Sequence, residues 1–233
     1  MAFVPSTKSR LLLGDFALQS YTTNITLNAV TDMLDTTVIT DTARQFIPGL
    51  NTSTLTLSGH HDAAEYADAA TFKAATSPTP LTYAPSGLAV AAEVALVDVL
   101  DAGFETSSAV TGVVDWSLSG QTNGQTDFGV SLADLAAVTV DANGVSHNNG
   151  AATSGGAVAH LHVTAFSGFT GVSVIVEDSA DDLSFATIGT FTSVTAVTGE
   201  RITIAGTVRQ YVRVRWDVTG TGSITAQAGY ARR

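Results

Sequence analysis

The feature that most constrains the fold is a series of short segments in which apolar and polar residues alternate. Six of them occupy the last third of the sequence, roughly 8–14 residues apart with turn-forming residues between them, at 158–166, 171–179, 185–194, 200–206, 209–218 and 222–233. Alternation with a period of two places successive side chains on opposite faces of a β-strand. Many short strands at this spacing predict a β-sandwich or jelly roll.

The segment RQYVRVRW, residues 209–216, has the clearest register of the six. Val212, Val214 and Trp216 fall on one face of the predicted strand. The opposite face carries Tyr211, Arg213 and Arg215, which could bind a phosphate or a sugar. The alternative is a solvated strand face whose arginines meet an acidic neighbour.

The first part of the chain also reads mainly as strands, with period-two alternation at 20–30 and 53–59 and a further strand at 112–121. One short helix is predicted at 62–77, because this stretch is rich in alanine, begins with Asp62 as a possible N-cap and stops before Pro78. Residues 88–105 combine alanines that suit a helix with valines that suit a long strand. The sequence therefore predicts an all-β fold with one short helix.

Composition divides the chain into two parts. All five prolines lie before residue 90 and both lysines before residue 74. Residues 1–130 have four Lys/Arg and thirteen Asp/Glu, a net charge of −9, whereas residues 131–233 have six Arg and eight acids, a net charge of −2. We therefore predict two domains, 1–140 and 141–233, with residues 143–156 as a flexible connection rich in Gly, Asn, Ser and Ala.

The same composition disfavours several classes of function. A net charge of −11 repels phosphate backbones, so a nucleic-acid binder that acts through counterion release is not expected. The sequence has no cysteine, no Gly-x-Ser-x-Gly elbow and no phosphate-binding glycine motif, so we predict no enzyme, with a hydrolase of degenerate site as the remaining alternative. It also has no apolar run long enough for a membrane span or a secretory signal, and we predict neither.

Two groups of residues could suggest a metal site. His160 and His162 lie two apart on a predicted strand and so share a face, but further ligands are not evident nearby, and surface or rim histidines are favoured. The stretch EDSADD, residues 177–182, lacks the spacing of a calcium loop, and a hairpin turn formed by Asp side chains is favoured. We predict no metal and no cofactor.

The order of elements resembles the tail tube, or major tail, proteins of long-tailed bacteriophages, particularly those that infect actinobacteria. The resemblance lies in DTTVITDTARQFIPGL followed by the alternating strand TSTLTLSG, then the alanine-rich helix, a proline break and the segment LTYAPSGLAVAAEVALVDVLDAGFE. The ending ERITIAGTVRQYVRVRWDVTGTGSITAQAGYARR is also similar to the C-termini of that family. The resemblance thus covers nearly the whole chain, through order, spacing and character of its segments.

This resemblance implies a structural virion protein that assembles with itself into stacked rings, usually hexameric, around a channel through which DNA passes without specific binding. It implies a tail-tube β-sandwich or barrel at 1–140 and an immunoglobulin-like or jelly-roll accessory sandwich at 141–233, and it favours a strand for 88–105. Two tube-type folds in trimeric rings are the alternative. The implied partners are the tape measure, tail terminator and distal tail proteins, with assembly in the host cytoplasm. A carbohydrate- or cell-surface-binding module is the alternative function.

The segment 41–49 is the candidate intersubunit loop. It places an apolar pair, Phe46 and Ile47, in a polar stretch without core-forming periodicity, beside Pro48 and Gly49. Phe46 and Ile47 are expected to be the apolar anchor, with Arg44 as a charged partner and Asp41 at the start of the loop. The alternative is that Phe46 and Ile47 fold back onto their own sandwich.

Overall fold

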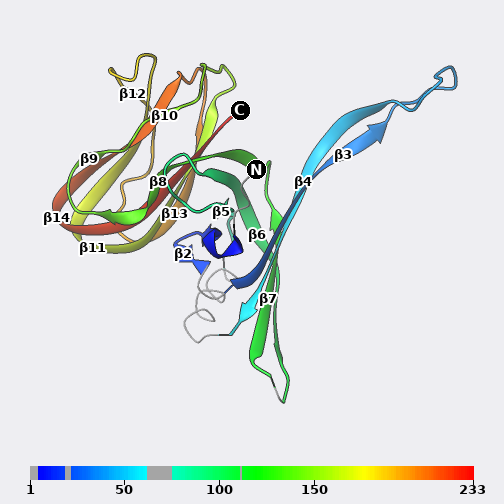
Figure 1. Ribbon diagram of the computed structural model, residues 1–233, viewed down its shortest axis with the longest axis horizontal. Coiled ribbons are helices and arrows are strands. Elements are labelled where there is room, and N and C mark those ends of the chain that lie inside the picture. Colours follow the sequence, from blue (N-terminus) through cyan, green and yellow to red (C-terminus); the bar gives the residue numbers. More distant parts are fainter. Residues whose placement is uncertain (1–4, 19–21, 62–74, 111) are drawn as a thin grey trace. The chain divides into compact units, whose positions relative to one another are not determined.

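The computed structural model of the chain describes residues 5–18, 22–61, 75–110 and 112–233 (Figure 1). Its long elements are all β-strands, and a short 3-10 turn, η1, lies at Ser6–Lys8. The predicted all-β fold is therefore confirmed. The helix expected at 62–77 falls mainly on residues 62–74, which lie outside the described residues. No helix in the described part is long and apolar enough to cross a membrane.

The contacts group the chain into two compact units. Unit 1 consists of residues 1–20, 79–98 and 127–233, and unit 2 consists of residues 21–78 and 99–126. The two segments of unit 2 thus interrupt the sequence of unit 1 at two places. This division differs from the predicted boundary between residues 140 and 141.

Unit 1 is built on antiparallel strands from both ends of the sequence. The strands follow the order β12-β11-β14-β8-β6-β5-β1-β2, and β13 pairs with β11 while β9 and β10 pair with β14. Their bounds are β1 Arg10–Leu13, β2 Phe16–Ala17, β5 Thr79–Ala84, β6 Glu93–Ser108, β8 Asp127–Val138, β9 Ala142–Asn143, β10 His147–Asn148, β11 Ala157–Ser179, β12 Ala186–Thr190, β13 Thr198–Ile204 and β14 Tyr211–Arg232. Only the first residues of β6 belong to this unit.

The strands β11 and β14 form a long ribbon, and each unites two segments that the sequence predicts as separate strands. The ribbon is irregular between Val163 and Gly171, where its register shifts three times. Gly168 has a φ of +78°, a conformation that side chains with a Cβ rarely adopt. At Gly222 a Cβ would collide with the backbone of Ser167 and Phe169, so glycine is required for the two strands to approach there.

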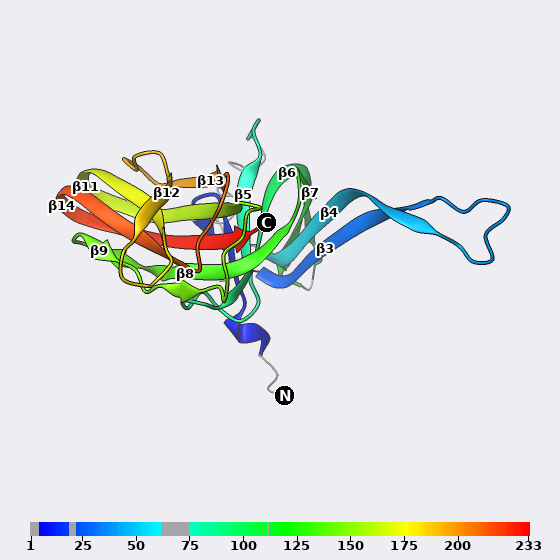
Figure 2. The same cartoon turned by 90° about the horizontal axis from the view of Figure 1, so that it is seen from above.

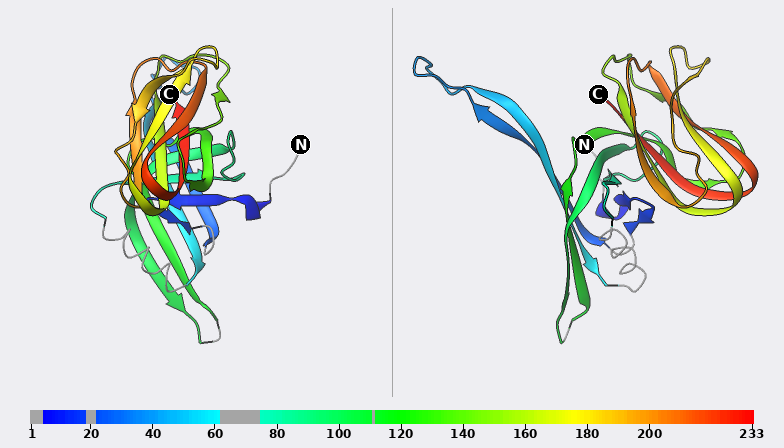
Figure 3. Two further views of the ribbon diagram at one scale, coloured as in Figure 1. Left: turned by 90° about the vertical axis from the view of Figure 1, so that its left-hand side faces the viewer. Right: turned by 180° about the vertical axis from the view of Figure 1, so that it is seen from behind.

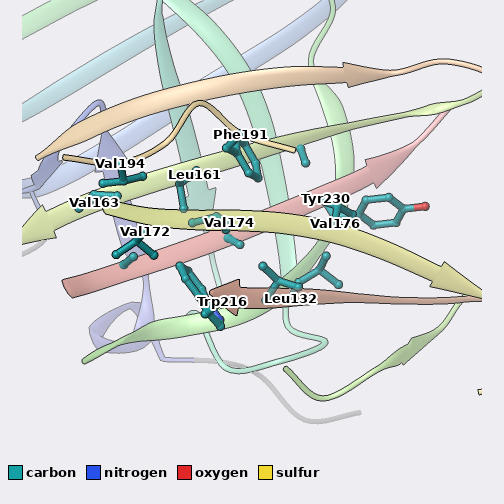
Figure 4. Close-up of a cluster of buried hydrophobic side chains, with 14 of the residues drawn as sticks. Leu132, Leu161, Val163, Val172, Val174, Val176, Phe191, Val194, Trp216 and Tyr230 are labelled. Atoms are coloured by element: carbon teal, nitrogen blue, oxygen red, sulfur yellow. The ribbon is translucent and has the colours of Figure 1, made fainter. Parts of the chain in front are cut away.

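The two ends of this ribbon contribute to one apolar core (Figure 4). Val212, Val214 and Trp216 are buried in it, while Arg213 and Arg215 on the other face are partly exposed, as the alternation predicts. Leu132 of β8 and Phe191, which follows β12, pack into the same cluster. The alternation of β14 thus determined the core face correctly.

Residues 143–156 are the predicted connection between the two domains. Asn143 pairs with Arg215, and His147 and Asn148 pair with Val212 and Tyr211 along β14. Their glycines and asparagines form turns between these short strands, for example at Gly150, whose amide donates to the side chain of Asn148. These residues thus pair in part with β14, and the flexible or weakly packed connection stays a prediction.

The boundary between residues 140 and 141 also separates two paired strands, because β8 pairs with β14 from Val130–Tyr230 to Val138–Ile224. Separate folding of 1–140 and 141–233 stays a prediction. A fragment of residues 143–233 tests it, because this fragment lacks β8, which provides Leu132 to the core.

Unit 2 is a four-stranded antiparallel sheet in the order β3-β4-β7-β6, with β3 at Thr22–Asp35, β4 at Phe46–His60 and β7 at Val114–Thr122 (Figures 1 and 3). Ile25, Leu57, Leu118 and Phe104 lie in register across the four strands and therefore share one face. Within the ambiguous segment 88–105, residues from Glu93 onward are strand, as the resemblance favours.

Candidate functional site

The distal part of the β3–β4 hairpin carries many of the exposed large apolar residues of the described part of the chain. β7 pairs with β4 only from Thr54 to His60. Nearer the turn, β3 and β4 therefore pair only with each other (Figure 2). Exposed apolar residues are concentrated in this part of the chain: Val30, Met33, Leu34, Val38, Ile39, Phe46, Ile47 and Leu50. A two-stranded ribbon is marginally stable in water, and large exposed apolar patches mark sites of interaction.

The apolar residues of the hairpin occupy both of its faces. Leu34 lies directly opposite Ile47, so their side chains share one face. Met33 lies opposite Pro48, and Phe46 lies opposite Asp35, on the other face. A ribbon with apolar side chains on both faces suits insertion between two surfaces rather than contact with one.

The predicted loop 41–49 is a loop only in its first half. Phe46, Ile47, Pro48 and Gly49 begin the strand β4, and Gly49 lies so close to Leu34 that a Cβ would approach its side chain to 3.2 Å. Phe46 and Ile47 are each 50% exposed and thus do not fold back into a core. The prediction of a loop did not recognise the start of β4, because Pro48 and Gly49 are typical turn residues.

The turn between the strands is held by its own polar side chains. The Asp41 carboxylate accepts a hydrogen bond of 2.8 Å from the backbone N–H of Val38. Asp35 accepts from both the N–H and the hydroxyl of Thr37, and these bonds lower the pKa of its carboxyl group. Arg44 is exposed. The turn is thus ordered locally while its apolar residues face solvent.

Tyr211, Arg213 and Arg215 lie side by side on the partly exposed face of β14, where the arginines are paired within the chain. Arg213 lies opposite Glu177 and donates to its carboxylate at 2.9 Å, and its guanidinium sits 3.8 Å from the centre of the Phe185 ring. Arg215 forms an ion pair of 2.9 Å with Asp217. This arrangement matches a strand face that meets acidic neighbours, and binding of a ligand there stays a prediction.

His160 and His162 are fully buried, which corrects their prediction as surface or rim histidines. The side chain of His162 forms hydrogen bonds of 2.7 Å with the Thr82 hydroxyl and with the carbonyl oxygen of Gly14. His160 lies 3.4 Å from the same hydroxyl. The second face of β11 is buried because strands from the first hundred residues cover it, which alternation within β11 cannot reveal.

An ionic cluster extends this polar region of unit 1. The carboxylate of Asp127 is 1% exposed and lies 2.6 Å from a guanidinium nitrogen of Arg201. Arg233 donates two hydrogen bonds to it, at 3.0 Å and 2.9 Å. Arg201 also lies near Asp98, and burial raises the pKa of Asp98 although the charge of Arg201 opposes this. The cluster joins the start of β8 to β13 and to Arg233.

We expect acid to destabilise unit 1 through the buried histidines. Burial lowers the pKa of His160 well below the ordinary value of 6.5 and that of His162 to about 4. Because the unfolded chain binds more protons between these values, the free energy of unfolding falls as the pH is lowered from about 6.5 to about 4, for His162 alone by about 3 kcal/mol. Asp98, whose pKa is raised, acts in the opposite direction at lower pH.

Urea unfolding at pH 7.5, 6 and 5 measures this dependence. The variant His162→Gln, which removes the buried imidazole, should reduce the slope of stability against pH. A slope equal to that of the native chain in His162→Gln would contradict the assignment to His162.

The second candidate metal group, residues 177–182, ends in a turn, and His60, elsewhere in the chain, lies 2.8 Å from the carboxylate of Asp115. Within residues 177–182, Asp181 accepts hydrogen bonds from the backbone N–H groups of Leu183 and Ser184, and these bonds lower its pKa to about 2. This is the predicted Asp-mediated hairpin turn. In the part of the chain that the structure describes, no three His, Cys, Asp or Glu side chains are grouped so that they could hold a metal ion.

No protein-family model matches the sequence, and no curated protein matches it. Among solved structures, the chain is similar to a chain in the virion of a native gene transfer agent particle, with 13% identity and a TM-score of 0.42 over 50% of this chain and 94% of that chain. A chain in the tail of the empty particle, of C6 symmetry, gives 12% identity and a TM-score of 0.41 with the same coverage.

A further similarity is to the SPP1 Dit protein (gp 19.1), described as a paradigm of the hub adsorption apparatus in phages that infect Gram-positive bacteria. It covers 95% of this chain and 98% of that chain, with 11% identity and a TM-score of 0.40. These three neighbours belong to a gene transfer agent particle and a phage hub, at a similarity too low to assign a function.

Proposed function

We propose that the chain is a structural subunit of a long-tailed phage tail that assembles with itself into stacked rings, hexameric by the resemblance, around a channel for DNA. The observation that carries the proposal is the β3–β4 hairpin, whose apolar residues lie on both faces and have no cover of their own in the described residues. Burial of such a surface by neighbouring subunits provides the main driving force for association. The role requires no catalysis and no cofactor.

The two faces of the unit 2 sheet fit this role. Opposite its apolar face, Thr26, Thr56 and Ser119 lie in register and are exposed, and Glu105 adds a negative charge on the same face. Hydroxyl groups are hydrated and carry no charge, and scattered carboxylates repel phosphates, so DNA can slide along such a face without binding. We infer that this face lines the channel.

The alternative, a carbohydrate- or cell-surface-binding module, receives less support. Its expected contacts, Arg213 and Arg215, are already engaged by Glu177 and Asp217. The tape measure, tail terminator and distal tail proteins remain proposed partners by resemblance, and the virion tail is the proposed location.

Electron microscopy of the purified protein tests the proposed function. Rings or tubes about 100 Å across, the diameter expected when six subunits of this size surround a channel, support it. A monodisperse monomer that binds glycans would favour the alternative module.

The variant Phe46→Ser should remain folded and fail to polymerise. Phe46 is half exposed in the monomer, so its replacement removes little packing within the chain but removes an apolar anchor of the contact. Sedimentation velocity and circular dichroism measure assembly and folding separately. Leu183→Ser is the matched control, because Leu183 is 84% exposed in a turn of unit 1 and its loss should leave assembly intact. Unfolding of Phe46→Ser would refute the contact model.

A further inference from the structure

A surface pocket of about 310 Å³ lies in unit 1 between the N-terminal segment and the turn after β5. Its lining combines two cationic side chains with an apolar wall and one carboxylate: Lys8, Arg10, Ser86, Leu88, Leu135 and Asp134. Its volume lies at the lower end of the range of ligand pockets and suits one or two side chains of a partner. Nothing in the role of the hairpin described above uses this pocket.

The two cations of the pocket differ from five of the six other arginines of unit 1. Those five form ion pairs with carboxylates: Arg201, Arg209, Arg213, Arg215 and Arg233. No carboxylate of the described residues pairs with Lys8 or Arg10, and the guanidinium of Arg10 donates to the backbone oxygens of Thr7 and Ser9. In a chain of net charge −11, two such cations in one pocket attract an acidic group.

We propose that this pocket receives the β3–β4 turn of a second copy of the chain. This inference rests on the proposed function, in which the hairpin is an assembly surface. Residues 32–45 contain three acidic residues, Asp32, Asp35 and Asp41, and one basic residue, Arg44. Their net charge of −2 is complementary to the two cations of the pocket. At the tip, Ile39 is completely exposed and next to Val38, which is also exposed.

The chemistry of the two surfaces matches at the level of single residues. Leu88 and Leu135 provide an apolar wall for Ile39, and Lys8 and Arg10 lie beside it to receive the carboxylate of Asp41 two residues further on. Insertion of Ile39 removes water from the ion pairs, which strengthens them. The contact is heterologous, hairpin to pocket, and such contacts generate rings or open stacks.

Disulfide cross-linking tests the contact directly, because the chain has no cysteine of its own. Full-length Ile39→Cys, carrying a tag that changes its mass, is assembled with untagged Ser86→Cys and oxidised. A disulfide needs Cα atoms within about 7 Å, so a covalent heterodimer is expected only if the hairpin turn reaches the pocket. The matched control is Val145→Cys, at an exposed valine elsewhere in unit 1, which should give no heterodimer with Ile39→Cys.

Charge reversal in the pocket provides a second measurement. Lys8→Glu should raise the protein concentration needed for assembly at least tenfold at low salt, with an unchanged melting temperature, because Lys8 is exposed in the monomer. Lys8→Gln should have a smaller effect.

The outcomes separate the two proposals. If the native protein does not assemble at all, the proposed function fails and this inference fails with it. If the native protein assembles but no Ile39–Ser86 heterodimer forms and Lys8→Glu assembles normally, the pocket is not the receptor and the proposed function stands. In a chain that carries both Ile39→Cys and Ser86→Cys, a disulfide within the single chain, without covalent dimers, would also overturn the inference.

Discussion

Replacement of Asp127 by asparagine should reduce the free energy of unfolding by about 3–5 kcal/mol, the range found when one partner of a buried ion pair is removed. Asp127 is buried with its carboxylate between Arg201 and Arg233, and Arg201 is itself only 13% exposed. Asparagine keeps the shape of the side chain but not the charge, so Arg201 would stay buried next to a neutral amide. Urea unfolding at pH 7.5, followed by circular dichroism, measures the difference.

Asp134→Asn on the same strand is the matched control. Its carboxylate is exposed and accepts only a local hydrogen bond, from the N–H of Leu135, so the expected change is within about 0.5 kcal/mol. Equal effects of the two substitutions would mean that the ionic cluster at Asp127 contributes nothing specific to stability.

Gly129→Ala should have a still larger effect and prevent unit 1 from folding. Gly129 lies in β8 where it packs against β14, and a Cβ at this position would collide with the carbonyl oxygen of Tyr230 and with Ala231. These are mainly backbone atoms, which cannot move aside like a flexible side chain, so the two strands would have to separate. The expected loss exceeds about 4 kcal/mol and should appear as insoluble protein or a lost melting transition.

Gly112→Ala provides the comparison for this substitution. A Cβ there would make an ordinary contact of 3.5 Å with Ala109, so stability should change by no more than about 0.5 kcal/mol. A soluble Gly129→Ala protein with the native melting temperature would contradict the close approach of β8 and β14.

The sequence was a good guide wherever local alternation decides the structure. The faces of β14 follow from Val212, Val214 and Trp216, and the turn at Asp181 follows from the chemistry of its side chain. It was a poor guide where a distant segment decides. His160 and His162 are buried because Thr82 and Gly14 meet them, more than seventy residues earlier in the chain.

The candidate sites show the same division. The apolar pair Phe46 and Ile47 was recognised from the sequence, because two large apolar residues without core periodicity stand out in a polar stretch. The sequence did not reveal that these two residues belong to a strand or that Leu34 lies opposite Ile47. Both facts depend on strand pairing across a turn of ten residues. The joining of Asp127 to Arg201 and Arg233 left no signal in the sequence, since residues separated by 74 and 106 positions carry no common pattern.

The position of β14 has a consequence for how the protein is made. This strand, Tyr211–Arg232, follows β8 and β11 in the sequence, yet it lies between them in the sheet. During synthesis on the ribosome, the edges of β8 and β11 that pair with β14 therefore stay unpaired until β14 has been translated. Pairings between such distant segments also form slowly. A nascent chain halted before residue 211 should thus be protease-sensitive and bound by chaperones. In the proposed assembly, a subunit can therefore join only after its β14 has been synthesised, so chains that lack β14 are excluded.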